Sequence, residues 1–236
     1  MKNPLHLIKR CLKNSPGFTL VELMVAMAVG SLVMGGVFVV WTQLFDVTAT
    51  NSNYMAAFYQ VQNGGDWTSN DALMTQGVYA MASTELDGGI TDSQVTIPVD
   101  STAGFPPVGV IAIEDELIQY IGKTDTQFTG CIRGSSATTH DDSTSVTFFI
   151  ALNWTAWSGD QYQVVYNLKE TSRELMRSQY INGNPQTAAI VAEAINLAGT
   201  TSAWDYDEKE LTVTITAQIG DEVVARTYKV NPRPLF

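Results

Sequence analysis

The sequence has few of the residues from which active sites and metal centres are usually built. It contains two cysteines, Cys11 and Cys131, and two histidines, His6 and His140, among 236 residues. The zinc-protease motif HExxH, the CxxC motif, the Walker loop and the dinucleotide motif GxGxxG are all missing. We therefore expect no catalytic residue, no cofactor and no transition-metal site, and we do not expect an enzyme.

Basic residues are scarce as well. The chain has 13 Lys and Arg against 24 Asp and Glu, which gives a net charge of −11. A general nucleic-acid-binding protein needs a basic face to attract phosphates, so we expect no nucleic-acid partner. Residues 1–17 are nevertheless basic, because they hold four Lys and Arg and no acid precedes Glu22. A basic N-terminal segment followed by an acidic remainder is typical of a membrane protein whose N-terminus stays in the cytoplasm.

One apolar run is long enough to cross a membrane. Residues 23–41 (LMVAMAVGSLVMGGVFVVW) include Ser31 as the only clearly polar side chain. At about 1.5 Å per residue, a helix of this length measures roughly 28 Å, close to the hydrocarbon thickness of a bilayer. A secretory signal has a shorter apolar region followed by a small-residue cleavage site, and none is evident near Trp41. The simplest interpretation is a signal anchor that tethers a domain outside the membrane.

Glu22 indicates more than a simple anchor. It lies four residues after Phe18, within the apolar stretch, where an unpaired carboxylate costs several kcal/mol. The natural partner is an α-amino group produced by cutting the chain between Gly17 and Phe18. That cation would lie in the same subunit or in a neighbouring one.

The residues around this bond resemble the class III signal of type IV prepilins and pseudopilins. The resemblance rests on residues 17–22 (GFTLVE), which follow a short basic leader and precede an apolar helix. It implies that prepilin peptidase cleaves between Gly17 and Phe18 and that Phe18 is then N-methylated. It also implies that Glu22 pairs with a neighbour's N-terminal amine during assembly. The helix-kinking proline common in major pilins is missing, since Val39 occupies that position.

The same resemblance implies partners and a location. The expected partners are other major and minor pilins, prepilin peptidase, the inner-membrane pilus assembly platform and membrane lipid. The expected location is the inner membrane, crossed once with the N-terminus cytoplasmic and the head periplasmic, and later the pilus fibre or cell surface.

We expect an α+β fold, with a long N-terminal transmembrane and amphipathic helix packed on an antiparallel β-sheet head that carries a small inserted β module. After residue 45, Tyr54, Phe58 and Val61 recur at helical spacing. Gly64-Gly65 would cost roughly 2 kcal/mol in a helix interior, so we predict a kink or break there and a helix end near Gly77. The expected divisions are a cleaved leader (1–17), a transmembrane helix (18–45), an amphipathic helix with the start of the head (46–87), the inserted module (88–146) and the antiparallel sheet of the pilin head (147–236).

The C-terminal third has the alternation of antiparallel strands. Residues 162–168 and 211–217 predict strands, and 219–222 predict a turn to a returning strand that Pro232 and Pro234 end. Residues 187–197 fit a short helix or a buried strand equally well. The signal region, the motif Arg-Glu-Leu-Met-Arg at 173–177 and the closing hairpin resemble the PilW type of minor pilin, and the alternative is a J-type pseudopilin of type II secretion.

Residues 88–146 differ in composition, being rich in Thr, Ser, Asp and Gly with short β-prone runs at 94–99, 109–113 and 116–121. The stretches STAGFP, ELIQYIGKT and FTGCIRG, followed by TTHDD, resemble a small β module found in phage virion and tail proteins. An elaborated pilin loop is the alternative.

The remaining candidate sites favour structural roles. Cys11 and His6 lie in the leader, so a mature chain would keep Cys131, expected as a buried small apolar residue, and His140, expected in a solvated loop. Calcium would need the oxygens of 205–208 or 141–142, which we expect to be solvated turn acids. Core packing is expected for three tryptophans that would otherwise suit a carbohydrate platform: Trp154, Trp157 and Trp204.

The functional hypothesis is therefore a minor pilin that primes or caps a type IV pilus. The alternatives are a J-type pseudopilin and a tip adhesin that binds through the inserted module.

Overall fold

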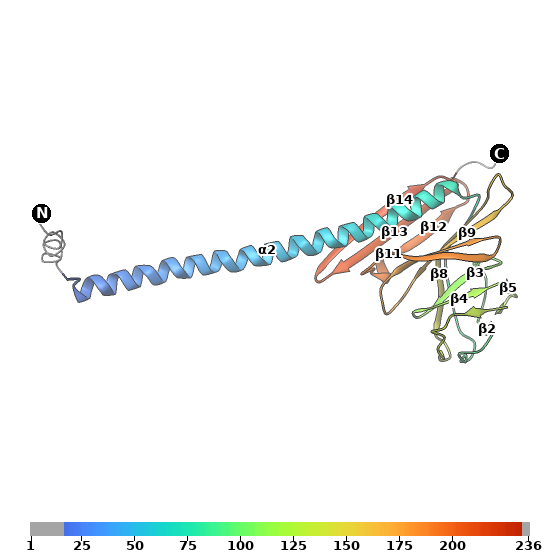
Figure 1. Cartoon of the computed structure of the whole chain (residues 1–236), viewed down its shortest axis with the longest axis horizontal. Helices are drawn as coiled ribbons and strands as arrows, with labels where there is room; N and C mark the ends of the chain where they lie inside the picture. The colour runs from blue at the N-terminus through green and yellow to red at the C-terminus, as the bar shows by residue number, and fades with distance from the viewer. Residues whose placement is uncertain (1–16, 233–236) are drawn as a thin grey trace, which may run out of the picture. The chain divides into compact units, whose positions relative to one another are not determined.

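The computed structural model describes residues 17–232, so residues 1–16 of the predicted leader, with Cys11 and His6, and the predicted stop at Pro234 lie outside the described residues. The fold is α+β, as expected, with one long N-terminal apolar helix and a curled antiparallel sheet accompanied by two small sheets (Figure 1). The chain divides at Asn51 and Ser52 into two compact units.

The helix α2 (Leu20–Met74) is continuous for 55 residues, so the break predicted at Gly64-Gly65 is wrong. A Cβ on Gly65 would lie 1.9 Å from Cζ of Tyr228, and one on Gly64 would touch Ile215, Ala192 and Leu175. The missing side chains let the helix backbone lie directly on the head. Tertiary packing therefore outweighs the poor helix propensity of the glycine pair.

Fourteen strands follow the helix within residues 17–232. The main sheet comprises β1 (Gly77–Glu85), β3 (Gly109–Ile113), β4 (Glu116–Tyr120), β7 (Ile132–Arg133), β8 (Ser145–Thr155), β9 (Gln161–Leu168), β10 (Leu175–Ile181) and β11 (Asn184–Ala192). A second sheet has the order β12 (Thr201–Asp205), β13 (Glu210–Ile219) and β14 (Glu222–Val230). A third has the order β2 (Thr96–Pro98), β6 (Gln127–Thr129) and β5 (Gly122–Lys123), and a short 3₁₀ turn, η2 (Leu197–Gly199), precedes β12.

Strand β8 organises the main sheet. One of its edges pairs with β1, while the other pairs with β3 near Val146 and with β9 from Ile150 onward. The sheet therefore branches, with β3-β4-β7 along the first half of β8 and β9-β10-β11 along the second.

The two faces of β8 supply two apolar cores. Phe149 and Leu152 join a core that includes the buried face of α2 and strands β13 and β14. Phe148 and Ala151 point to the other face, into a core built largely from residues 86–131. In this second core the ring of Phe105 lies 5.2 Å from that of Phe148.

The predicted strands of the C-terminal third are confirmed as β9, β13 and β14, and residues 187–192 of the undecided segment belong to the strand β11. The segment 88–146 joins two paired strands, because Glu85 of β1 lies opposite Ser145 of β8. Its strand β3 also hydrogen-bonds to β8, which makes it part of the main sheet. Its division from the head as a module stays a prediction.

Candidate functional site

The start of α2 is fixed by a reciprocal capping box. The backbone N–H of Glu22 donates to Oγ1 of Thr19 at 3.2 Å, while the N–H of Thr19 donates to Oε2 of Glu22 at 3.1 Å. Two backbone donors that a helix start leaves unpaired are thereby satisfied. The helix therefore begins at Leu20, and Gly17 and Phe18 precede it in non-helical backbone.

The predicted cleavage and assembly residues lie together at this exposed end. Phe18 is 87% exposed, and Gly17 is exposed beside it. Glu22 uses Oε2 for the cap, whereas its Oε1 accepts no hydrogen bond within residues 17–232. The carboxylate thus faces back toward the N-terminal side of the helix with one oxygen free.

The first half of α2 presents apolar side chains that its own chain leaves uncovered. None of the most apolar stretch of this helix is buried, and the helix is long and apolar enough to cross a membrane. Three glycines in this half, Gly30, Gly35 and Gly36, have no atom within 4 Å of an added Cβ in the described part of the chain. A lipid bilayer would cover a surface of this length and composition.

The second half of α2 is attached to the head by a buried charged group. Nε of Arg177 lies 2.7 Å from Oδ2 of Asp71, and its Nη2 lies 3.0 Å from Oδ1. The hydroxyl of Tyr166 donates to the same carboxylate, and the guanidinium lies 5.2 Å from the ring centre of Trp67. Burial, and next the Asp71 charge, raise the pKa of Tyr166, so the hydroxyl stays protonated and donates. Sequence reasoning missed Asp71, whose only signal is an acid on the apolar face of an amphipathic helix.

The expectation that His140 lies in a solvated loop is wrong. Its side chain is 1% exposed, with Nδ1 3.0 Å from Oε2 of Glu114 and Nε2 2.9 Å from Oε2 of Glu116. Arg133 completes the group through two bonds to Glu116, of 2.8 Å and 2.6 Å. Burial works against the charged form of Glu116, but bonds from Arg133, His140 and the N–H of Thr138 outweigh it and lower its pKa. The group crosslinks β4, β7 and the loop before β8.

The other singled-out side chains divide between core and surface. Cys131 is buried, and burial raises the pKa of its thiol to about 11, as suits the expected apolar role. Trp154 and Trp204 are partly buried against the first core, as expected. Trp157 is fully exposed, so core packing is wrong for this residue.

Carboxylate oxygens in the acidic turns already accept hydrogen bonds from backbone N–H groups. Oδ1 of Asp205 accepts the N–H groups of Asp207 and Glu208 at 2.8 and 3.0 Å, and Oδ1 of Asp142 accepts the N–H of Gly88 at 2.7 Å. No group of three or more His, Cys, Asp or Glu among residues 17–232 has an arrangement that would hold a metal ion.

Comparison with known proteins gives one match. Residues 12–38 match the prokaryotic N-terminal methylation motif. No curated protein and no solved structure matches the chain. The motif and the apolar helix that follows it support a type IV pilin-like or pseudopilin protein with a membrane-anchoring segment.

Proposed function

We propose that the chain is a minor type IV pilin, most similar to the PilW type, that takes part in pilus assembly in a priming or tip complex. The observation that carries this proposal is the methylation motif at 12–38, which runs directly into an uncovered apolar helix. A structural role also agrees with the two apolar cores of the head and with the charged pairs that crosslink its strands and helix.

Processing is proposed at the bond between Gly17 and Phe18, with N-methylation of Phe18. Two features support this position. The bond lies in exposed backbone outside the helix, so a membrane peptidase can reach it without unwinding α2. The cap formed by Thr19 and Glu22 holds the helix start beyond the bond.

Assembly is proposed to use the free oxygen of Glu22. One carboxylate oxygen caps its own helix, and the other can accept a neighbour's Phe18 amine. In hydrocarbon, such a pair removes the cost of an isolated charge and sets the axial register of two helices. The first half of α2 supplies the apolar contact area that surrounds the pair.

The location and partners follow from this assembly. The helix crosses the inner membrane with a cytoplasmic N-terminus and a periplasmic head, and the subunit later enters the fibre or cell surface. Its partners are prepilin peptidase, other major and minor pilins, the assembly platform and membrane lipid.

The two roles of Glu22 are separated by three variants. Glu22→Gln keeps an acceptor for the cap but removes the charge, Glu22→Leu removes both, and the control Thr19→Ala weakens the cap while the charge stays. We expect all three to insert and to be cleaved. Recovery of the subunit with crosslinked pilins should fall strongly for both Glu22 variants and stay near wild type for Thr19→Ala.

Two outcomes would contradict the proposal. If Glu22→Gln assembles normally while Thr19→Ala does not, Glu22 acts as a cap and the proposed pair is wrong. A secretion pseudopilin is also supported by the methylation motif. Deleting the gene should therefore abolish or reduce pili while leaving protein secretion intact, and the reverse result would assign the chain to a secretion system.

A further inference from the structure

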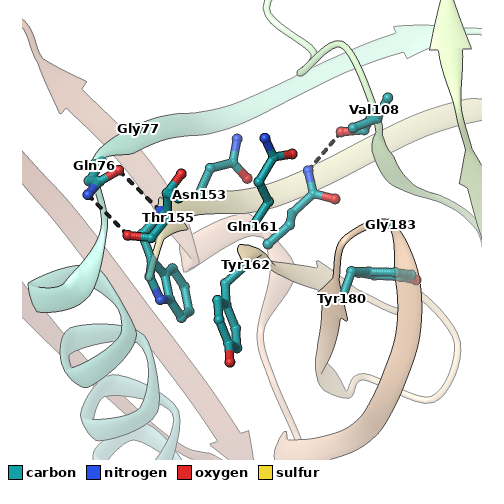
Figure 2. A pocket seen from close by; sticks show the side chains of 11 residues that line it. Gln76, Gly77, Val108, Asn153, Thr155, Gln161, Tyr162, Tyr180 and Gly183 are labelled. Atoms are coloured by element: carbon teal, nitrogen blue, oxygen red, sulfur yellow. Dashed lines mark hydrogen bonds between the residues drawn. The ribbon is translucent and has the colours of Figure 1, made fainter. Parts of the chain in front are cut away.

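The head contains a pocket of about 410 Å³ along β8, β9 and β10, and its lining combines amide and hydroxyl groups with the aromatic residues Trp154, Tyr162 and Tyr180 (Figure 2). Sheet register builds it, because Asn153, Gln163 and Tyr180 lie in one row across these strands and Thr155 and Gln161 lie in the next row. Gly77 of β1 lies opposite Asn153 and leaves that side open. We call this site the amide pocket, and its other lining residues include Gln76, Val108 and Gly183.

Four polar side chains in the amide pocket have no internal partner. The side chains of Asn153, Thr155, Gln161 and Tyr180 make no hydrogen bond within residues 17–232. Oδ1 of Asn153 is buried and unpaired, which costs free energy unless something donates to it. In Figure 2 the amides of Asn153 and Gln161 lie on one side of the strands, while the ring of Tyr162 points to the other. The polar groups of these four side chains thus have no hydrogen-bond partner within the described residues, although the ring of Tyr180 packs in the second core.

The walls beside these groups are held in place. The amide of Gln76 pairs with the backbone of Thr155, accepting from its N–H at 3.1 Å, and Nε2 of Gln163 donates to the carbonyl of Val108 at 2.8 Å. The free side chains therefore stand on a sheet whose neighbouring amides are already satisfied. A pocket of this kind needs little reorganisation to bind a ligand.

The chemistry of the lining selects the class of ligand. No Asp, Glu, Lys or Arg lines the amide pocket, so a phosphate, carboxylate or amine would find no opposite charge. Amides and hydroxyls both donate and accept, which suits a ligand covered with hydroxyl groups. A peptide that adds a strand would need an open strand edge, and this site lies on a sheet face.

An exposed aromatic ring lies next to the amide pocket along the chain. Trp157 occupies the tip of the β8–β9 hairpin, between the lining residues Thr155 and Gln161, and is fully exposed. The hairpin is held by Asn182, whose Nδ2 donates to Oδ1 of Asp160 at 2.8 Å and whose Oδ1 accepts the N–H of Gln161 at 2.9 Å. A fully exposed Trp offers an apolar face to the C–H side of a sugar ring.

We propose that the amide pocket binds a neutral saccharide. Thr155, Gln161 and Tyr180 bind its hydroxyl groups, and Trp157 contacts an adjoining ring in longer chains. This binding lies wholly in the head and does not depend on how α2 assembles.

The test uses the full-length protein in nanodiscs, because detergents with sugar headgroups would compete. The probes are maltotriose, lactose and mannotriose, with sialyllactose and a random peptide array as comparators. We expect at least one neutral probe to bind. Gln161→Ala should weaken that binding about tenfold, the equivalent of one lost hydrogen bond. Tyr180→Phe should weaken it several-fold, and neither change removes an internal hydrogen bond.

Trp157→Ala should lower affinity for the trisaccharides more than for lactose. Its matched control is Tyr206→Ala, which removes another exposed aromatic from a hairpin turn and should change nothing. The proposal is overturned if no neutral probe binds, if sialyllactose or peptides bind better, or if Gln161→Ala and Tyr180→Phe leave affinity unchanged.

Discussion

The two halves of α2 show how one helix is built for two surroundings. Every residue from Leu20 to Ser52 is exposed in the isolated chain. Beyond that point seven residues are buried against the head, at the helical spacing of a single face: Ala57, Val61, Gly64, Gly65, Thr68, Asp71 and Ala72. Residues 23–41 of the first half are apolar apart from Ser31, whereas the second half carries a stripe of small and polar residues fitted to particular partners. An apolar surface is enough for contact with lipid or with a helix bundle. Packing on the head also requires side chains of fitting shape and a paired buried charge.

The largest loss of stability should come from replacing Arg177, which holds the second half of α2 on the head. Arg177→Met leaves the Asp71 carboxylate buried without its cation, which typically costs about 3–5 kcal/mol. Urea unfolding followed by tryptophan fluorescence should show this loss in the head. The control Arg226→Met removes an exposed cation 5.3 Å from the ring of Tyr228 and should cost under ~1 kcal/mol. Equal effects of the two changes would mean that the Asp71 group does not fasten the helix.

Alanine substitutions at glycines of the two halves should change stability by smaller and opposite amounts. Gly65→Ala forces the Tyr228 ring aside and disturbs its bond to the carbonyl of Val61, at a cost of about 1–3 kcal/mol. Gly35→Ala meets open space and should favour the helix by up to ~1 kcal/mol without changing the head. The check is the unfolding midpoint of each variant. A stable Gly65→Ala head would show that the close contact is dispensable.

Lowering the pH should reduce the stability of the head, and this effect should be smaller than those of the Arg177 and Gly65 substitutions. The pKa of Glu116 is lowered in the folded state, so its contribution is fully present above the ordinary value of 4.5 and is lost as pH falls through the lower folded value. Wild type should therefore lose stability over this range more steeply than Glu116→Gln. Thermal unfolding between pH 7 and pH 3 measures the difference, and parallel curves would contradict a role for the Glu116 group.

The part of the fold that depends on local pattern could be predicted from sequence. Three features are local patterns that extend over about ten to twenty residues each. They are the apolar run, the motif at residues 17–22 and the alternation of strands β13 and β14. The continuity of α2 at Gly65 could not, because it depends on Tyr228 from the last strand.

The same limit explains the missed charged groups. Asp71 meets partners 95 and 106 residues away, and His140 meets carboxylates 24 and 26 residues away. Polar residues in a Thr- and Asp-rich stretch look solvated until a fold brings their partners together. The amide pocket is hidden for a related reason, since its row of side chains comes from three strands in register.

The most direct test of the pilin-like account is the intact mass and N-terminal sequence of the protein isolated from native membranes. We expect a chain that begins at Phe18, lacks the 17 residues before it and carries one methyl group on its α-amine. A chain that keeps those residues, or one cut on the far side of the apolar run, would contradict it.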